Sequence, residues 1–128
     1  MKREERKLIK SINNWLQQYR IKNYVINEDL TINVKGNVDL TYKNLDSFPT
    51  YIQFNFVDGI FDCSENKLIS LRGCPRIVTG NFLCFNNKLD SLNNCPEEVY
   101  GRFFCHGNLR KFDLPEIMKL CDVSYINN

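Results

Sequence analysis

The only histidine of this chain, His106, directly follows one of its six cysteines, Cys105. A thiol beside an imidazole can form a nucleophile with its general base, or it can supply two ligands of a zinc site. Both kinds of site require the two side chains to reach the same point in space. Whether Cys105 and His106 can meet therefore depends on the secondary structure that carries them.

The segment that contains this pair is one copy of an internal repeat. Two closely similar copies, VDGIFDCSENKLISLRGCP and VTGNFLCFNNKLDSLNNCP, begin 21 residues apart at Val57 and Val78. A third copy, VYGRFFCHGN, begins at Val99, and a degenerate copy, VKGNVDL, begins at Val34. All four copies share the pattern V-x-G-x-[FV]-x-[CL]. A fixed period of this length is the signature of a solenoid protein.

Each copy opens with an alternation of period two, which is the pattern of a β-strand with one buried face. The Val, Gly, Phe and Cys positions are expected to face inward, and the residues between them outward. A unit of about 21 residues leaves no room for a crossover helix of its own, so the units are expected to stack as a parallel solenoid with strands ~4.8 Å apart.

This alternation predicts that Cys105 and His106 leave their strand on opposite faces and cannot pair. The chain has no C-x-x-C motif, and a single histidine leaves only cysteines as further zinc ligands. We favour the interpretation that the repeated cysteines are small apolar residues that fill tight coils, with a metal site or a disulfide as the alternative. Two columns are expected, one inward on the strands and one at the turns: Cys63, Cys84 and Cys105, and Cys74 and Cys95.

The repeat resembles the leucine-rich repeat, whose pattern is L-x-x-L-x-L-x-x-N/C-x-L. Its second half is matched by Phe61-x-Cys63-x-x-Asn66-x-Leu68 and again at residues 82–89, whereas the first leucine has no counterpart. More closely, NKLISLRGCPRIVTGNFLCFNNKLDSL and the opening WLQQYRIKNYVINEDLT are similar to short repeat proteins encoded by bacteriophages. This resemblance implies a viral origin without implying an activity. It also implies a structural role for three asparagines that recur at the strand exits: Asn66, Asn87 and Asn108.

The composition is that of an ordinary globular protein. The chain has 128 residues, of which 43% are hydrophobic and 25% charged, with a formal net charge of +2. We expect a single domain over residues 1–128. No apolar run approaches the ~20 residues of a membrane span, and the charged start MKREERKLIKSINNWL does not resemble a secretory signal. These features predict a cytoplasmic protein with reduced thiols and no membrane association.

The segments outside the repeat region (35–112) are expected to cap the solenoid. The N-terminal cap, residues 1–23, contains a helix predicted over residues 3–21 that stops near Asn23. Its apolar face is formed by Leu8, Ile12, Trp15, Leu16 and Tyr19. Residues 24–34 are predicted to form a β-hairpin that leads into the solenoid.

The C-terminal cap, residues 113–128, is predicted to contain a short helix from Pro115 and a closing strand at residues 123–126. Caps of this kind are needed because an open edge strand invites aggregation.

The outward-facing positions change character along the chain. In the first two copies they are mostly polar: Lys35, Asn37, Asp39, Thr41, Asp58, Ile60, Asp62 and Ser64. In the last two copies they become aromatic: Thr79, Asn81, Leu83, Phe85, Tyr100, Arg102, Phe104 and His106. Aromatic and Arg side chains are the residue types that anchor protein interfaces. We therefore predict a protein-binding site at Leu83, Phe85, Tyr100, Arg102, Phe104 and His106. The alternative is that the C-terminal segment folds over these side chains and buries them.

Taken together, the sequence predicts an α+β fold, a leucine-rich-repeat-like parallel β solenoid of about four coils of 21–23 residues. We expect a non-enzymatic interaction module without a cofactor or metal, whose partner is a host protein, such as a defence component that it would inhibit. Two alternatives stay open: a structural or self-assembling viral component, and a nucleic-acid binder. The latter, which we favour less, would use the basic start of the first helix: Lys2, Arg3, Arg6, Lys7 and Lys10.

Overall fold

The computed structural model describes residues 2–127 and shows an α+β fold whose centre is a β-solenoid of about four turns. The N-terminal part consists of α1 (Arg3–Gln18), β1 (Tyr24–Ile26) and β2 (Ile32–Lys35). The coils contribute β3 (Val38–Asp39), β4 (Phe54–Asp58), β5 (Phe61–Asp62), β6 (Ile77–Val78), β7 (Phe82–Leu83) and β8 (Glu98–Phe104). The chain closes with α2 (Leu114–Leu120) and β9 (Asp122–Asn127).

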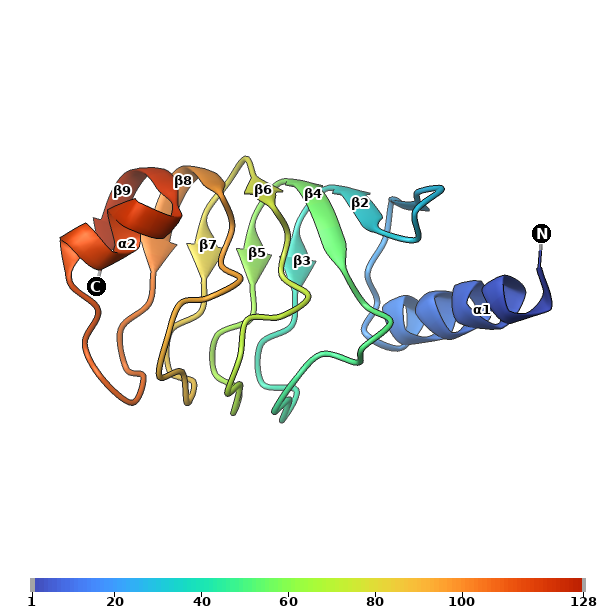
Figure 1. Cartoon of the computed structure of the whole chain (residues 1–128), viewed down its shortest axis with the longest axis horizontal. Coiled ribbons are helices and arrows are strands. Elements are labelled where there is room, and N and C mark those ends of the chain that lie inside the picture. Colours follow the sequence, from blue (N-terminus) through green and yellow to red (C-terminus); the bar gives the residue numbers. More distant parts are fainter. Residues whose placement is uncertain (1, 128) are drawn as a thin grey trace.

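The strands form one sheet along the solenoid (Figure 1). One parallel ladder joins β2, β4, β6 and the start of β8, and a second joins β3, β5, β7 and the end of β8. β9 adds a parallel strand to β8, and β1 pairs antiparallel with β2 at the opposite end. The predicted parallel stacking and the predicted hairpin are therefore confirmed.

The alternation predicted one continuous strand for each repeat, and this was wrong for the first three coils, where the strand breaks at the repeat glycine. Successive coils leave no room for a side chain here, and the Gly80 N–H donates to the Gly59 carbonyl oxygen at 2.8 Å. A Cβ atom on Gly80 would lie 2.7 Å from that oxygen, and one on Gly101 would lie 2.6 Å from the Gly80 carbonyl carbon. Only a residue without a side chain permits this spacing, so glycine recurs at this level of each coil.

The inward phenylalanines of the coils form a continuous aromatic spine. The ring centroids of Phe61 and Phe82 lie 5.9 Å apart, and those of Phe82 and Phe103 lie 5.2 Å apart. Phe54 extends the spine toward the N-terminus at 5.2 Å from Phe61. All four side chains are fully buried. These separations are within the range in which aromatic pairs attract each other, so the spine holds the coils in register.

Asn66, Asn87 and Asn108 lie above one another and form what is here called the asparagine column. This column connects each coil to the one before it, which agrees with the structural role that the resemblance implied. The Asn87 Oδ1 accepts from the Leu68 N–H at 3.0 Å. The Asn87 Nδ2 donates to the carbonyl oxygens of Cys63 and Cys84, both at 3.1 Å. The corresponding side chains of Asn66 and Asn108 make the same kind of bonds in the neighbouring coils. A single amide thus satisfies backbone groups that lose their ladder partners where the strands end.

The N-terminal helix covers the first coil with only part of its length. Ile12, Trp15 and Leu16 are buried as predicted, whereas Leu8 is 40% exposed and the first turns project away from the solenoid (Figure 1). The helix ends at Gln18, three residues before its predicted end at residue 21. It ends early because Arg20 adopts a left-handed backbone conformation, with φ of 58°.

The C-terminal cap has the predicted helix and strand, with β9 one residue longer at each end than expected. The Asp113 carboxylate caps α2 by accepting from the Glu116 N–H at 2.9 Å, and Pro115 lies in its first turn. Ile117 is buried against the last coil. The segment extends the sheet by one strand instead of folding over the outward face (Figure 1).

The position of Trp15 generates a stability prediction. Trp15 is 6% exposed, and its ring centroid lies 5.9 Å from that of Phe48 and 6.4 Å from that of Phe54. Trp15→Ala should lower the free energy of unfolding by ~3–5 kcal/mol, as measured by urea denaturation, because a large core side chain is lost. Leu8→Ala, on the projecting part of the same helix, should change it by less than about 1 kcal/mol. Equal effects of the two substitutions would contradict this description of the cap.

The asparagine column can be tested at Asn87. Asn87→Ala removes the partner of one backbone N–H and one side-chain hydrogen bond from each of three carbonyl groups, and we expect a loss of about 2–3 kcal/mol in the free energy of unfolding. Asn93 is exposed, and its side chain makes no hydrogen bond within residues 2–127. Asn93→Ala should therefore cost less than about 1 kcal/mol in the same denaturation experiment. A loss as small at Asn87 as at Asn93 would show that the column is dispensable.

Candidate functional site

The Cys105–His106 pair follows directly after β8, and the alternation of that strand continues through both residues. Cys105 is 1% exposed and faces the core, whereas His106 is exposed on the outer surface. The imidazole lies flat on the Phe85 ring, with centroids 4.8 Å apart and an interplanar angle of 11°. Burial, with a smaller contribution from the charge of Glu116, raises the pKa of Cys105 to about 11. The thiol is therefore protonated near neutral pH and lies on the opposite face from the only imidazole, so the pair is not a nucleophile and its base.

The remaining cysteines have the features of structural thiols. All six are free, and five of them are buried. Burial is the main reason that the pKa values of Cys95 and Cys121 rise to about 12, and neighbouring thiols add to the shift. Burial likewise raises the pKa of Cys74 and of Cys84 well above the ordinary value. Residues 2–127 contain no group of three or more His, Cys, Asp or Glu side chains arranged to hold a metal ion.

On the outer face of the first coils, polar side chains already have partners within the chain. The Asp39 carboxylate accepts from the Thr41 hydroxyl at 2.7 Å and from its N–H at 3.0 Å, which holds the pKa of Asp39 below its usual value. The Asp62 carboxylate accepts from Ser64 in the same way. Ser64 was predicted to face outward, but it is 1% exposed, whereas Thr41, which makes the same bond on the coil before, is half-buried. The polar half of the face thus leaves few groups for a ligand.

The last two coils bring the six predicted binding residues onto one surface, here called the aromatic patch: Leu83, Phe85, Tyr100, Arg102, Phe104 and His106. Leu83 and Phe104 are register partners on β7 and β8. Tyr100 is 58% exposed, Arg102 and His106 are exposed, and the other three are half-buried. The patch is therefore open to solvent, and the alternative in which the C-terminal segment buries it is wrong.

The structure adds Tyr125 to this surface, a residue that the sequence did not single out. β9 places Tyr125 beside Arg102 in the sheet, and the Arg102 guanidinium carbon lies 5.6 Å from the centroid of the Tyr125 ring. Tyr125 is 64% exposed, whereas Val123 and Ile126 are half-buried. The inward residues of β9 are thus three positions apart, so its sequence does not show the period-two pattern that reveals outward residues elsewhere.

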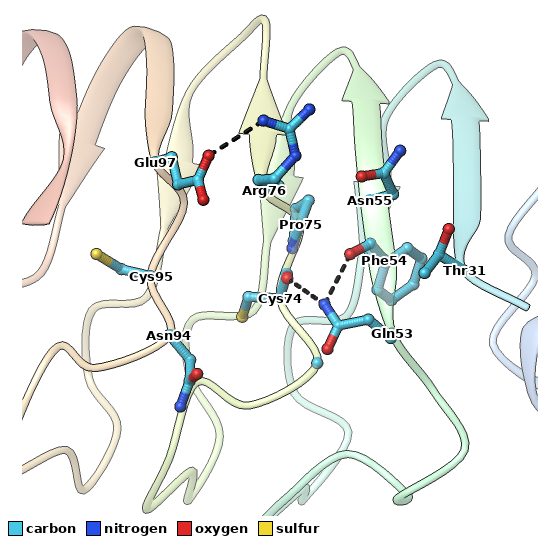
Figure 2. Close-up of a pocket in the computed structure, with 11 residues that line it drawn as sticks. Thr31, Gln53, Phe54, Asn55, Cys74, Pro75, Arg76, Asn94, Cys95 and Glu97 are labelled. Carbon is cyan, nitrogen blue, oxygen red and sulfur yellow. Dashed lines mark hydrogen bonds and ion pairs between the residues drawn. The ribbon is translucent and has the colours of Figure 1, made fainter. Parts of the chain in front are cut away.

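A groove of about 300 Å³ lies away from the patch, on the segment that returns from one coil to the next (Figure 2). The Gln53 Nε2 donates to the carbonyl oxygens of Phe54 and Cys74, at 2.8 Å and 2.9 Å. Arg76 and Glu97 form an ion pair at 3.1 Å on its rim. These polar side chains bind one another or the backbone, so the groove has the character of a hydrogen-bonded turn region rather than of a ligand site.

Comparison with known proteins gives no match to a protein-family model, to a curated protein or to a solved structure. Neither of the helices in residues 2–127 has the length and apolar character needed to cross a membrane.

The thiol environment generates a prediction about reactivity. At pH 8, Cys95 with a pKa of about 12 should hold roughly a thousandfold less thiolate than a free cysteine, so iodoacetamide should label the native chain far more slowly than the denatured chain. Mass spectrometry of timed samples measures this. Rapid labelling of Cys63, Cys84 and Cys105 in the native chain would overturn their inward assignment. Stoichiometric zinc in the purified protein would overturn the structural role of the thiols.

The same raised pKa values predict a pH dependence of stability. Below the pKa of a free thiol, ~8.5, the cysteines are neutral in both the folded and the unfolded chain. As pH rises from there toward 12, the unfolded chain releases protons that the folded chain retains at Cys95 and Cys121, so the free energy of unfolding falls. Thermal unfolding followed at pH 7, 9 and 10.5 should show a decreasing midpoint. A midpoint that rises over this range would contradict the burial of the thiols.

Proposed function

We propose that this chain is a non-enzymatic interaction module that binds another protein through the aromatic patch on the outer face of its solenoid. The stacked pair Phe85 and His106 is the observation that carries the proposal. Two flat rings lie in contact on an open β-surface, beside the exposed side chains of Tyr100 and Arg102. Contiguous surfaces of this composition are uncommon on monomers without a partner, and their residue types are those of interface hot spots.

The two halves of the outer face support different roles. Around Asp39 and Asp62, the side chains are held by hydrogen bonds within the chain. Around Phe85 and Phe104, the half-buried rings present apolar area that only a partner would remove from water. In a complex, the aromatic half supplies the binding energy, and the acidic half influences the association rate and its dependence on salt.

The resemblance to bacteriophage-encoded repeat proteins supports a host protein as the partner and the host cytoplasm as the place of action. Inhibition of a host defence protein fits this proposal, because a rigid solenoid face can cover the active surface of another protein. No residue chemistry identifies that protein, so the experiment below starts from host lysate.

A second candidate function, nucleic-acid binding, is favoured by one observation on α1. Its projecting first half carries exposed Lys7 and Lys10, with Lys2 and Arg3 before them. These charges would give an affinity that falls steeply with salt and does not depend on sequence. Glu4 in the same turns weakens the positive field, and for this reason the aromatic patch remains our principal proposal.

The proposed function is tested by the double substitution Phe85→Ala, Phe104→Ala, with Tyr42→Ala as the matched control. Tyr42 is an aromatic side chain on the first coil and is 76% exposed. Tagged proteins are used to capture partners from lysate of infected host cells, and circular dichroism verifies that each variant is folded. Truncation of a hot spot costs about 2 kcal/mol or more, so the double variant should lose its partner while the control keeps it.

A folded double variant that still captures the same partner would exclude the aromatic patch as the binding site. Should the double variant unfold, Arg102→Glu and His106→Ala offer a second test, because both side chains are exposed and their replacement leaves the core intact. Binding to single-stranded or duplex oligonucleotides, lost when Lys7 and Lys10 become Glu, would replace the proposal by the second candidate.

A further inference from the structure

The two ends of the sheet differ in how well their edges are protected. On the C-terminal side, β9 pairs with β8 along one edge, and no strand of residues 2–127 pairs with its other edge. β9 is six residues long, with the sequence DVSYIN. It lacks the Pro and Lys that protect natural edge strands, whereas the edge strands at the other end, β1 and β3, have only three and two residues. Within residues 2–127, the unprotected sheet edge is therefore β9.

The hydrogen bonds of the coils show which backbone groups of β9 are directed at this edge. In each coil, an inward residue donates its N–H to the following coil: Phe61 to Asn81 at 3.0 Å, and Cys63 to Leu83 at 2.9 Å. The carbonyl oxygen of inward Val57 likewise accepts from the following coil, from Thr79 at 3.0 Å. Within β9, Val123 and Ile126 occupy inward positions as the register partners of Val99 and Phe103. Their N–H and C=O groups therefore point to the place where a further coil would lie.

Apolar side chains surround this edge. Met118 is 66% exposed and Leu120 40% exposed, and both line a groove of about 360 Å³ together with Val123. Tyr125 stands on the outer side of the same strand and is 64% exposed. If a large side chain has a surface of roughly 200 Å², the exposed fractions of Met118, Leu120 and Tyr125 leave about 300 Å² of apolar surface open on each chain. Two such ends, together with the two strand edges, approach the ~1,000 Å² that a specific interface needs.

We propose that β9 pairs antiparallel with β9 of a second copy of this chain, which gives a two-fold symmetric dimer with a continuous sheet. When Val123 lies opposite Ile126 of the second copy, the free N–H and C=O groups of these two residues hydrogen-bond to each other. The two-fold axis produces the same pairing between Ile126 and Val123 of the second copy. The sequence of β9 suits this pairing because it has the same polarity from either end: a polar residue, an apolar residue, two central residues, an apolar residue and a polar residue. The contact is isologous, so it closes at two chains.

The charge distribution favours the C-terminal end over the N-terminal end for this contact. Residues 1–35 contain eight Lys or Arg and four Asp or Glu, so two N-terminal caps repel each other. Residues 113–127 contain one Lys and three Asp or Glu, a net charge of −2 against +4 for residues 1–35. Two C-terminal ends therefore repel each other less strongly than two N-terminal caps do.

Dimerisation through β9 has a consequence for the outer face. The aromatic patch lies on the last two coils, and Tyr125 extends it to the edge of the sheet. In the dimer the two patches adjoin across the two-fold axis, and the polar coils lie at the two distal ends. The change from polar to aromatic residues along the solenoid is then the profile of one binding surface that is apolar at its centre and polar at its rim.

Sedimentation velocity of the purified full chain, from about 1 to 100 μM, tests the proposal without any partner protein. The wild-type chain should sediment as a dimer at the upper concentrations. In the proposed register Ser124 lies opposite Tyr125 of the second copy, and the two Ser124 residues are one position apart along the paired strands. Ser124→Lys therefore brings two positive charges close together at the exposed centre of the contact and should weaken the dimer by about tenfold or more. Ser91→Lys makes the same change at an exposed position on an earlier coil and should leave the dimer unchanged.

Three outcomes would overturn the proposal: a wild-type chain that is monomeric at 100 μM, a dimer that Ser124→Lys does not weaken, or species that grow beyond two chains with concentration. The last would indicate head-to-tail contacts between β9 and β1. If circular dichroism shows that Ser124→Lys is unfolded, Met118→Glu on the exposed side of α2 takes its place. Its control is Ile69→Glu, which changes an equally exposed apolar side chain on an earlier coil. A monomeric chain that still captures its partner through the aromatic patch would leave the proposed function in place and exclude only the dimer.

Discussion

The close approach of successive coils at the repeat glycines is the constraint on which the rest of this structure depends. The N–H of Gly80 reaches the carbonyl of Gly59 where no Cβ atom fits between the chains. Once this spacing is set, each inward side chain lies directly above its counterpart 21 or 23 residues earlier, so the same shape must recur at every level. The phenylalanine spine and the asparagine column follow from this, because a ring or amide that fits one level fits the next.

The outward positions are free of this constraint, and for that reason they carry the functional information. Some of them still serve the fold: the Asn37 Oδ1 accepts from the Ile60 N–H, and the Asn81 Oδ1 from the Arg102 N–H, both at 2.8 Å. Phe85 and His106 have no such backbone role and lie against each other on the surface. Where the same residue type recurs at one position of every coil, stacking between coils explains it. Phe85 differs from Ser64, which occupies the same position in the coil before, and stacking within the chain does not explain this change.

Much of the fold could be predicted from the sequence because the repeat imposes it. The parallel stacking, the burial of Trp15 and the opposite directions of Cys105 and His106 all follow from periodicity. The early end of α1 could not, since it depends on the left-handed conformation of Arg20, which no pattern announces. The burial of Ser64 was also missed, because Thr41 occupies the same position of its coil and makes the same bond but is only half-buried, so the local pattern does not distinguish the two residues.

The candidate site was predicted in its composition but not in its extent. The six residues of the aromatic patch could be read from alternation on β7 and β8. Tyr125 could not, because Val123 and Ile126 are both inward although they stand three positions apart. Whether the patch is covered depends on the path of the last fifteen residues, and a helix followed by a strand is compatible with either a lid or a further strand.

The two caps end the sheet in different ways, and the difference connects the fold to the proposed binding surface. β1 runs antiparallel to its neighbour and is short, so it ends the ladder with few free groups. β9 runs parallel to β8 and repeats the geometry of a coil, so it closes one edge and creates another. Because β9 pairs in the same way as the strands of the coils, it leaves a free edge to which a further strand could be added. The aromatic side chains accumulate toward this same end, so the free edge of β9 and the aromatic patch form one continuous surface. A single association can therefore remove both from water.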